Sequence, residues 1–135
     1  MLKPPKLTVI VSIFLLTSAT GCAVTNKLSK KFIQNPSTFA LADHLKQKGA
    51  KMYGTYWCIA CQGQKKAFGK EAFNKINYIE CDPAGLNPQL NLCKQAKVTG
   101  FPTWEIDGKL SCQGGCTLSN LADLSDYKGD RNFGQ

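Results

Sequence analysis

The sequence predicts an α/β domain in which a central four-stranded mixed sheet is flanked by helices. Three observations predict this class. Segments with strand and helix patterns alternate along the chain, Trp57-Cys58-Ile59-Ala60-Cys61 lies between a strand pattern and a helix pattern, and Phe101-Pro102-Thr103 opens a later strand that continues into a hairpin. The chain of 135 residues has room for one domain of roughly 110 residues after a leader, so we expect a single core.

The first 22 residues are typical of an export signal. Lys3 and Lys6 form a basic start, and the apolar stretch from Leu7 to Ala19 is too short for a membrane span of about twenty residues. Ala19-Thr20-Gly21-Cys22 resembles the bacterial lipobox, which implies that Cys22 is lipidated. Ordinary cleavage and an uncleaved N-terminal anchor are the alternatives. All three place the domain outside the cytoplasm, and the favoured one attaches it to a membrane on the periplasmic or another extracytoplasmic face.

Residues 23–37 are polar and basic and predict a flexible tether, which leads to a domain at residues 38–135. The net charge of +8 would suit a nucleic-acid partner, but Arg131 is the only arginine and no aromatic platform accompanies the lysines. We therefore expect no nucleic-acid partner and a lysine-rich surface near an anionic membrane instead. A module of this size is expected to be a monomer.

The first part of the domain reads as helix, strand and helix. A helix capped by Ser37 or Thr38 is expected to run to Lys48, and a strand over residues 50–56 leads directly into the first cysteine pair. A second helix is expected over residues 60–73, because apolar residues recur there at helical spacing. The residues of this helix predicted to face inward are Ala60, Ala67, Phe68 and Ala72.

The middle of the domain reads as a strand followed by a helix. Alternation over residues 76–81 predicts the second strand, and Asp82-Pro83-Ala84-Gly85 then breaks the chain. Asn87-Pro88 supplies a cap and a first-turn proline for a helix that is expected to run to Lys97.

The last part of the domain reads as a hairpin and a helix. Strands are expected over residues 103–106 and 109–112, because Asp107-Gly108 is a strong signal for a two-residue hairpin turn. Thr117 caps a final helix, whose core-facing residues are predicted to be Leu118, Leu121 and Leu124.

Cys58 and Cys61 form the predicted redox pair, because two thiols at this spacing can open and close one disulfide. Cys58 would lie at a helix N-terminus, where unpaired N–H groups and the helix dipole favour an anion, so we expect its pKa to fall below the free value of about 8.5. It is the predicted nucleophile, and Cys61, one turn further along, is the predicted resolving thiol. The disulfide itself carries the electrons, so no cofactor and no metal is expected.

Four residues around the pair are predicted to bind the substrate: Trp57, Phe101, Pro102 and Thr103. Trp57 offers a flat apolar surface to a peptide, although it could equally fill the core. Pro102 is expected to be a cis proline packed against the cysteine pair, and an ordinary proline at the start of a strand is the alternative. It lacks an N–H, which leaves the backbone of Phe101 free to pair with an incoming peptide.

These residues resemble thioredoxin-like proteins, and among them the thioredoxin-like domain fused to bacterial and plant homologues of vitamin K epoxide reductase. The resemblance covers roughly residues 41–127. It implies a module that passes disulfides between exported protein thiols and a quinone-linked membrane partner, here expected to act in trans, with oxidation of substrates favoured over reduction. It rests on Gly49-Ala50-Lys51-Met52-Tyr53-Gly54, Tyr56-Trp57-Cys58, the Cys58 and Cys61 pair, Cys81, Cys93, Phe101-Pro102-Thr103-Trp104 and Asp107-Gly108.

Two departures from that family bear on the redox chemistry. Ile59-Ala60 stands where the family often has Pro-His between the cysteines, which leaves the reduction potential open. Met52 stands where typical thioredoxins hold a buried acid six residues before the first cysteine, as it does in the fused family. That acid assists proton transfer to the resolving thiol, so its replacement makes the behaviour of a cytoplasmic reductase less favoured.

Four further cysteines suggest structural disulfides, which persist in oxidising compartments. Cys81 and Cys93 are twelve positions apart, and a disulfide between them would stabilise the domain by about 2–4 kcal/mol. A relay that exchanges with the redox pair is the alternative. Cys112 and Cys116 are also expected to form a disulfide, with a second redox pair or two metal ligands as alternatives.

The leading prediction is therefore an exported thiol–disulfide oxidoreductase that acts on protein substrates. A protein without enzymatic activity that binds zinc or copper is the first rival, and its ligands would be Cys58, Cys61, Cys112 and Cys116. A structural lipoprotein with three permanent disulfides is the second rival.

Overall fold

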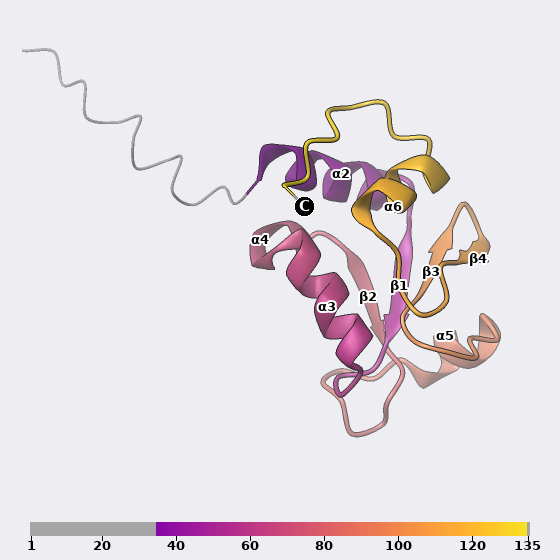
Figure 1. Cartoon of the computed structure of the whole chain (residues 1–135). Coiled ribbons are helices and arrows are strands. Elements are labelled where there is room, and N and C mark those ends of the chain that lie inside the picture. The colour runs from indigo at the N-terminus through magenta and orange to yellow at the C-terminus, as the bar shows by residue number, and fades with distance from the viewer. Residues whose placement is uncertain (1–34, 135) are drawn as a thin grey trace, which may run out of the picture.

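A mixed sheet of four strands lies at the centre of this computed structural model, which describes residues 35–134 (Figure 1). The strands lie side by side in the order β2-β1-β3-β4. β1 pairs in parallel with β2, whereas the β1–β3 and β3–β4 pairs are antiparallel, so the predicted four-stranded mixed sheet is confirmed. The strands are β1 (Lys51–Gly54), β2 (Asn77–Glu80), β3 (Thr103–Ile106) and β4 (Lys109–Ser111).

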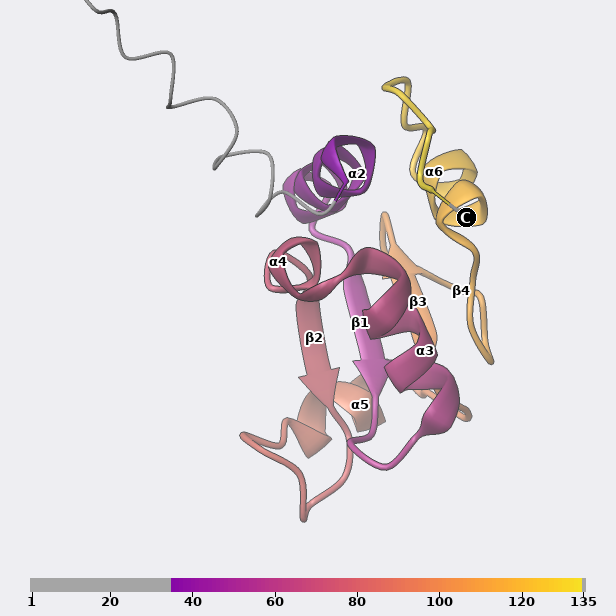
Figure 2. The same cartoon turned by 60° about the vertical axis from the view of Figure 1, so that its left-hand side comes forward.

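Helices cover both faces of the sheet, as Figure 2 shows. α2, α3 and α6 share one face and its core, and the short α5 lies against the other face. None of the helices within residues 35–134 has the length and the apolar character needed to cross a bilayer. The helices are α2 (Pro36–Gln47), α3 (Ile59–Phe68), α4 (Lys70–Phe73), α5 (Leu90–Gln95) and α6 (Leu118–Leu124).

The core lies between the sheet and the helices α2, α3 and α6. Met52 of β1 and Trp104 of β3 are cross-strand neighbours on the face beneath these helices, and both are completely buried. The ring of Phe68 from α3 lies 6.0 Å from that of Trp104. Full burial of each such apolar side chain contributes about 1.5–3 kcal/mol, so this layer holds α3 firmly over the sheet.

The two ends of the described chain are bonded together at the start of α2. Asn35 caps this helix by accepting hydrogen bonds from the Ser37 and Thr38 N–H groups, and its own amide donates to the Asn132 carbonyl at 3.0 Å. The Ser37 hydroxyl also donates to a carboxylate oxygen of Asp130. The C-terminal segment therefore closes over the point at which the chain enters the domain.

The predicted export signal at residues 1–22, the lipidation site Cys22 and residues 23–34 of the predicted tether lie outside the described residues. Where the chain is described, the first helix begins earlier than expected. Asn35 is its cap in place of Ser37 or Thr38, and Pro36 occupies the first helical position. This proline suits that position because its fixed φ is helical and its missing N–H has no partner there anyway.

The helix expected over residues 60–73 is two helices. Gly69 adopts a φ of 78°, which ends α3 and lets α4 start in a new direction. Phe68 and Ala72 are buried as predicted, but Ala60 is exposed. The inward positions near the start of α3 are instead Cys61 and Gln64.

Two further helix predictions are corrected. α5 begins at Leu90 and ends at Gln95, because Asn87 has a φ of 49° and does not act as the cap. In α6, Leu118 and Leu121 are completely buried but Leu124 is 46% exposed. The buried stripe of α6 continues through positions i+3 and i+4 to Ala122, which turns Leu124 toward the opposite side.

The hairpin turn and the cap of the last helix lie where the sequence predicted them. Asp107 and Gly108 both have positive φ, at 50° and 74°, as a type I′ turn requires. The Thr117 hydroxyl accepts a hydrogen bond from the Asn120 N–H and caps α6. β3 has the bounds that were expected, whereas β1 is confined to Lys51–Gly54.

Candidate active site at the start of helix α3

Cys58 occupies the N-cap of α3, directly after the central strand β1 and a short turn. Its sulfur forms a disulfide with Cys61, with 5.2 Å between the Cα atoms, and accepts a hydrogen bond from the Cys61 N–H at 3.1 Å. A helix N-terminus presents unpaired N–H groups and the positive end of the dipole, which both stabilise a thiolate. This position therefore suits a cysteine that must react as an anion.

The two sulfurs differ in access. Cys58 is 7% exposed, whereas Cys61 lies one turn deeper and is completely buried. An incoming partner therefore reaches Cys58 first, and the Cys61 sulfur can react only with a group already attached to Cys58.

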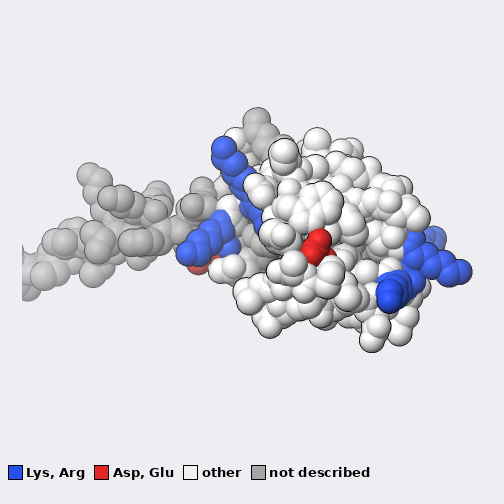
Figure 3. Space-filling model, turned by 90° about the horizontal axis from the view of Figure 1, so that it is seen from below, with Lys and Arg blue, Asp and Glu red and all other residues white. Residues whose placement is uncertain are grey.

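Exposed apolar side chains surround the disulfide. Trp57 is 57% exposed and Ile59 is 85% exposed, so Trp57 does not fill the core. The indole N–H of Trp57 donates to Asp82 at 2.8 Å, and this bond, together with the Ala84 N–H, holds the pKa of Asp82 below its usual value. The end of the molecule that carries these loops is largely uncharged, with an acidic side chain near its middle and basic side chains toward its edges (Figure 3).

The segment Phe101-Pro102-Thr103 lies at the same end of the sheet. Its Phe101–Pro102 peptide bond is cis, Pro102 is buried, and Thr103 pairs with Tyr53 of β1. The backbone N–H and carbonyl of Phe101 make no backbone hydrogen bond within residues 35–134. The structure thus brings this segment and the end of β1 that leads to Cys58 close together, although they are distant in sequence.

The other four described cysteines also form two disulfides. Cys81–Cys93 joins the end of β2 to α5, with Cα atoms 5.9 Å apart, and lines a pocket of about 220 Å³ together with Phe101. Cys112–Cys116 closes the loop between β4 and α6, with Cα atoms 5.3 Å apart. This second loop contacts the site, because the Gly114 N–H donates to the Pro102 carbonyl at 2.8 Å.

The cysteines are paired and do not gather around one point. Among residues 35–134, no three His, Cys, Asp or Glu side chains lie close enough together to hold a metal ion. The ligand set expected for a zinc or copper protein is thus separated into two disulfides, Cys58–Cys61 and Cys112–Cys116.

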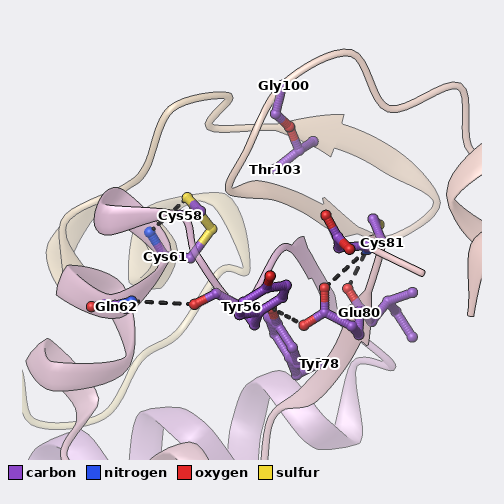
Figure 4. The surroundings of a disulfide bond; sticks show 11 residues. Tyr56, Cys58, Cys61, Gln62, Tyr78, Glu80, Cys81, Gly100 and Thr103 are labelled. Carbon is purple, nitrogen blue, oxygen red and sulfur yellow. Dashed lines mark hydrogen bonds between the residues drawn. A yellow bond between two sulfur atoms is a disulfide. The ribbon is translucent and has the colours of Figure 1, made fainter. Parts of the chain in front are cut away.

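Two residues that the sequence reading did not select lie beside the disulfide. Glu80 is only 4% exposed, and its carboxylate accepts hydrogen bonds from the Tyr78 hydroxyl at 3.1 Å and from the Asp82 N–H at 2.9 Å (Figure 4). Burial, and then the neighbouring Glu80 charge, raise the pKa of Tyr78. The signal in the sequence was the Tyr-x-Glu spacing, which places both side chains on one face of a strand.

No family model matches the chain. It is 42% identical over 100 residues to the thiol-disulfide oxidoreductase LTO1 of Arabidopsis thaliana. The match covers 72% of this chain but only 26% of that protein, so the chain spans about a quarter of the length of the curated relative. This similarity and the four-stranded mixed sheet fit a thioredoxin-like protein, and the cysteines at disulfide distance support a redox role.

Proposed function

From its thioredoxin-like α/β fold, we propose that this chain is an exported thiol–disulfide oxidoreductase that exchanges disulfides with protein substrates through Cys58 and Cys61. One observation carries the proposal: a disulfide at the N-terminus of α3 whose first cysteine, Cys58, keeps 7% of its surface exposed while the second, Cys61, is completely buried. The similarity to a protein named thiol-disulfide oxidoreductase supports it.

The exchange uses the two sulfurs in sequence. In the oxidising direction a substrate thiolate attacks Cys58, the bond to Cys61 breaks, and a mixed disulfide forms between the substrate and Cys58. A second substrate thiolate then attacks its own sulfur in this mixed disulfide and displaces Cys58. The substrate has lost two electrons and gained a disulfide, and the protein holds two thiols. The reducing direction runs through the same steps in reverse.

Flexible segments of exported proteins are the substrates that this surface fits best. The apolar side chains of Trp57 and Ile59 lie next to the disulfide and are available for contact with a peptide. The backbone of Phe101, which makes no backbone hydrogen bond within residues 35–134, adds a hydrogen-bonding edge at the same end of the sheet. Neither contact requires a particular side chain of the substrate, which suits an enzyme that acts on many sequences.

The test compares serine variants of the redox pair in an insulin disulfide-exchange assay with the full chain. Cys58→Ser should abolish turnover, because it removes the sulfur through which the exchange begins. Cys61→Ser should instead accumulate a mixed disulfide between Cys58 and the substrate, which is visible as a band on a non-reducing gel that thiols remove. Turnover retained by Cys58→Ser would overturn the proposed function.

The direction of electron flow follows from the reduction potential of Cys58–Cys61. We propose that the protein oxidises its substrates and is reoxidised in trans by a quinone-linked membrane protein of the vitamin K epoxide reductase type. A potential of about −120 to −180 mV in a glutathione series would support a disulfide donor, whereas about −270 mV would make the protein a reductase or an isomerase. Thiol alkylation followed by mass spectrometry reads the oxidised fraction at each glutathione ratio.

Membrane attachment through a lipid on Cys22 is part of the same proposal and rests on the sequence. In bacterial cells the full chain should fractionate with membranes and carry a diacylglycerol mass at Cys22. The Cys22→Ser variant should lose that mass. An unmodified Cys22 in a membrane-bound protein would instead support the uncleaved anchor.

A further inference from the structure

We propose that Glu80, through the hydroxyl of Tyr78, accepts the proton of the Cys61 thiol and returns it during disulfide exchange. The inference rests on the proposed function, because only a cysteine pair that opens and closes needs such an acceptor. Cys61 is completely buried, so it has no direct access to water when its thiol must lose or regain a proton. Near neutral pH, an acceptor supplied by the protein itself therefore offers the direct route for this proton.

The pairing of β1 and β2 brings Tyr78 and Glu80 beneath α3. The strands are parallel, with Met52 opposite Tyr78 and Gly54 opposite Glu80. Residues opposite one another in a sheet project from the same face, and this is the face that α3 and its cysteine cover. Met52 of β1 is thus not an acid, but the residue opposite it in β2 is Tyr78, which is hydrogen-bonded to Glu80.

Gly54 leaves open a small space that the Cys61 sulfur and the Tyr78 hydroxyl both border. A Cβ added at this glycine would lie 3.0 Å from the Cys61 sulfur and 3.1 Å from the Tyr78 hydroxyl oxygen. Both atoms therefore face the same small space above the backbone of Gly54. Figure 4 shows Tyr78 and Glu80, which are hydrogen-bonded to one another, in the surroundings of the disulfide.

The surroundings of Glu80 enclose its carboxylate without neutralising it by an ion pair. Besides Tyr78 and the Asp82 N–H, the loop after β2 covers it closely, since a Cβ at Gly85 would lie 2.4 Å from its carboxyl carbon. No salt bridge to Glu80 occurs among residues 35–134. Lys65 of α3 is the nearby cation, and its ammonium lies 3.7 Å from the centre of the Tyr78 ring.

Glu80 is a buried carboxylate, and burial disfavours a charge unless hydrogen bonds offset the loss of hydration. The groups around it are Tyr78, Lys65 of α3 and Asp82 of the following loop, and the Cys61 sulfur borders the same space above Gly54 as the Tyr78 hydroxyl. Of these, the Cys61 thiol is the group that must change its protonation in every exchange cycle. A part in this proton transfer gives the buried carboxylate of Glu80 a function beyond its two hydrogen bonds.

The proposed step balances as follows. In the mixed disulfide, Cys58 is bonded to the substrate sulfur and Cys61 is a thiol. The thiol gives its proton to the Tyr78 hydroxyl while that hydroxyl gives its own proton to Glu80. The Cys61 thiolate attacks the Cys58 sulfur, the Cys58–Cys61 disulfide forms, and the substrate sulfur leaves as a thiolate. Over the attack by Cys58 and this resolving step together, the cysteine pair loses two electrons and the substrate disulfide gains them. In the oxidising direction Glu80 returns the proton to the departing Cys61.

The test separates attack from resolution with the aromatic disulfide DTNB as the probe. The reduced full chain releases one thionitrobenzoate when Cys58 attacks and a second when Cys61 resolves the mixed disulfide, so stopped-flow absorbance gives two phases. At pH 6, Glu80→Gln and Tyr78→Phe should slow the second phase by about tenfold or more, within the range of general acid–base effects, and leave the first within about twofold. The deficit should shrink as the pH rises to about 9, where the thiol ionises unaided.

The chain contains a matched control on the other face of the sheet. The Tyr53 hydroxyl donates to Glu105 at 2.6 Å, so Tyr53→Phe and Glu105→Gln remove an equivalent hydrogen bond away from the cysteine pair. Neither control should change the second phase. Because Glu80→Gln alters a buried group, near-ultraviolet circular dichroism must show a native fold, and Tyr78→Phe, which removes a single oxygen atom, carries the test if Glu80→Gln does not fold.

The outcomes are distinct. A second phase within twofold of the unmodified protein in both Glu80→Gln and Tyr78→Phe at pH 6 would overturn the inference, as would equal slowing by Tyr53→Phe. In those cases the two phases of the unmodified protein still stand. An unmodified protein that shows no second phase would overturn the proposed function itself.

Discussion

Replacing Gly54 with alanine should destabilise the oxidised domain, because the added methyl group has no room. Its carbon would lie 2.9 Å from a ring carbon of Tyr78 and 3.0 Å from the Cys61 sulfur. Neither neighbour can yield easily. Tyr78 is bonded to Glu80, and the sulfur belongs to the disulfide at the start of α3.

The magnitude follows from two opposing terms. Inserting a methyl group into a filled interior costs about 1–3 kcal/mol. The alanine also restricts the unfolded chain, which returns about 0.4–1 kcal/mol. A net loss of roughly 1–2 kcal/mol lowers the melting temperature of a domain of this size by about 4–8 °C for each kcal/mol. We therefore expect a decrease of about 5–15 °C in thermal unfolding of the full chain followed by far-ultraviolet circular dichroism.

Gly63 provides a control of opposite sign. It lies within α3, it is exposed, and a Cβ added there would meet nothing within 4 Å. Gly63→Ala should therefore stabilise the domain by about 0.5–1 kcal/mol, the usual gain at an exposed helical glycine. A Gly54→Ala variant that melts at or above the temperature of the unmodified protein would refute the close approach of both Tyr78 and Cys61 to Gly54, on which the proton-transfer proposal depends.

Three further outcomes are expected. Replacing both cysteines of Cys81–Cys93 with serine should lower the free energy of unfolding by about 2–4 kcal/mol in urea titrations and leave insulin exchange intact; lost exchange in the folded variant would favour a relay. Lys51 and then Tyr53 hold the pKa of Glu105 below 4.5, so its stabilising contribution is present above that value and is lost as the pH falls through the lowered pKa. Glu105→Gln should thus cost about 1 kcal/mol at pH 7 and nothing once Glu105 is protonated, as denaturant titrations at both pH values will show. Trp57→Ala should reduce exchange with insulin severalfold but hardly change the reaction with DTNB, since its 57% exposed ring can contact a polypeptide; equal losses would contradict a substrate-binding role.

Elements with strong local signals could be predicted from the sequence. The turn at Asp107-Gly108 and the cap at Thr117 depend on a few adjacent residues, and both lie where they were expected. The strand from Thr103 to Ile106 also has its predicted bounds, because a proline before it and a turn after it leave little choice.

Other boundaries depend on backbone conformations that the sequence pattern does not reveal. Gly69 and Asn87 both take positive φ, and these two residues divide the second helix and shorten α5. The exposure of Leu124 has a different cause. Helical spacing allowed either Ala122 or Leu124 to complete the buried stripe, and the packing of α6 selected the smaller residue.

The cysteine pair and Glu80 also differ in whether the sequence alone could predict them. Cys58 and Cys61 could be selected from spacing and order, because the chemistry of a disulfide is contained within four residues. Glu80 could not, because its proximity to the disulfide depends on the parallel register that sets it opposite Gly54. A register between strands that are far apart in sequence leaves no local pattern. The sequence shows that position 52 is not an acid, but it does not show that the adjacent strand brings Glu80 to the site.

The closure of the C-terminal segment over the start of α2 has a mechanical consequence. Asn35 is bonded to Asn132 and Ser37 to Asp130 at the end of the domain opposite the Cys58–Cys61 disulfide (Figure 1). A force applied to the chain ahead of Asn35 is therefore shared at once between α2 and the last residues of the domain. The load enters far from the reactive sulfurs, so pulling on the chain should leave their spacing, and hence the rate of exchange, unchanged until this junction breaks.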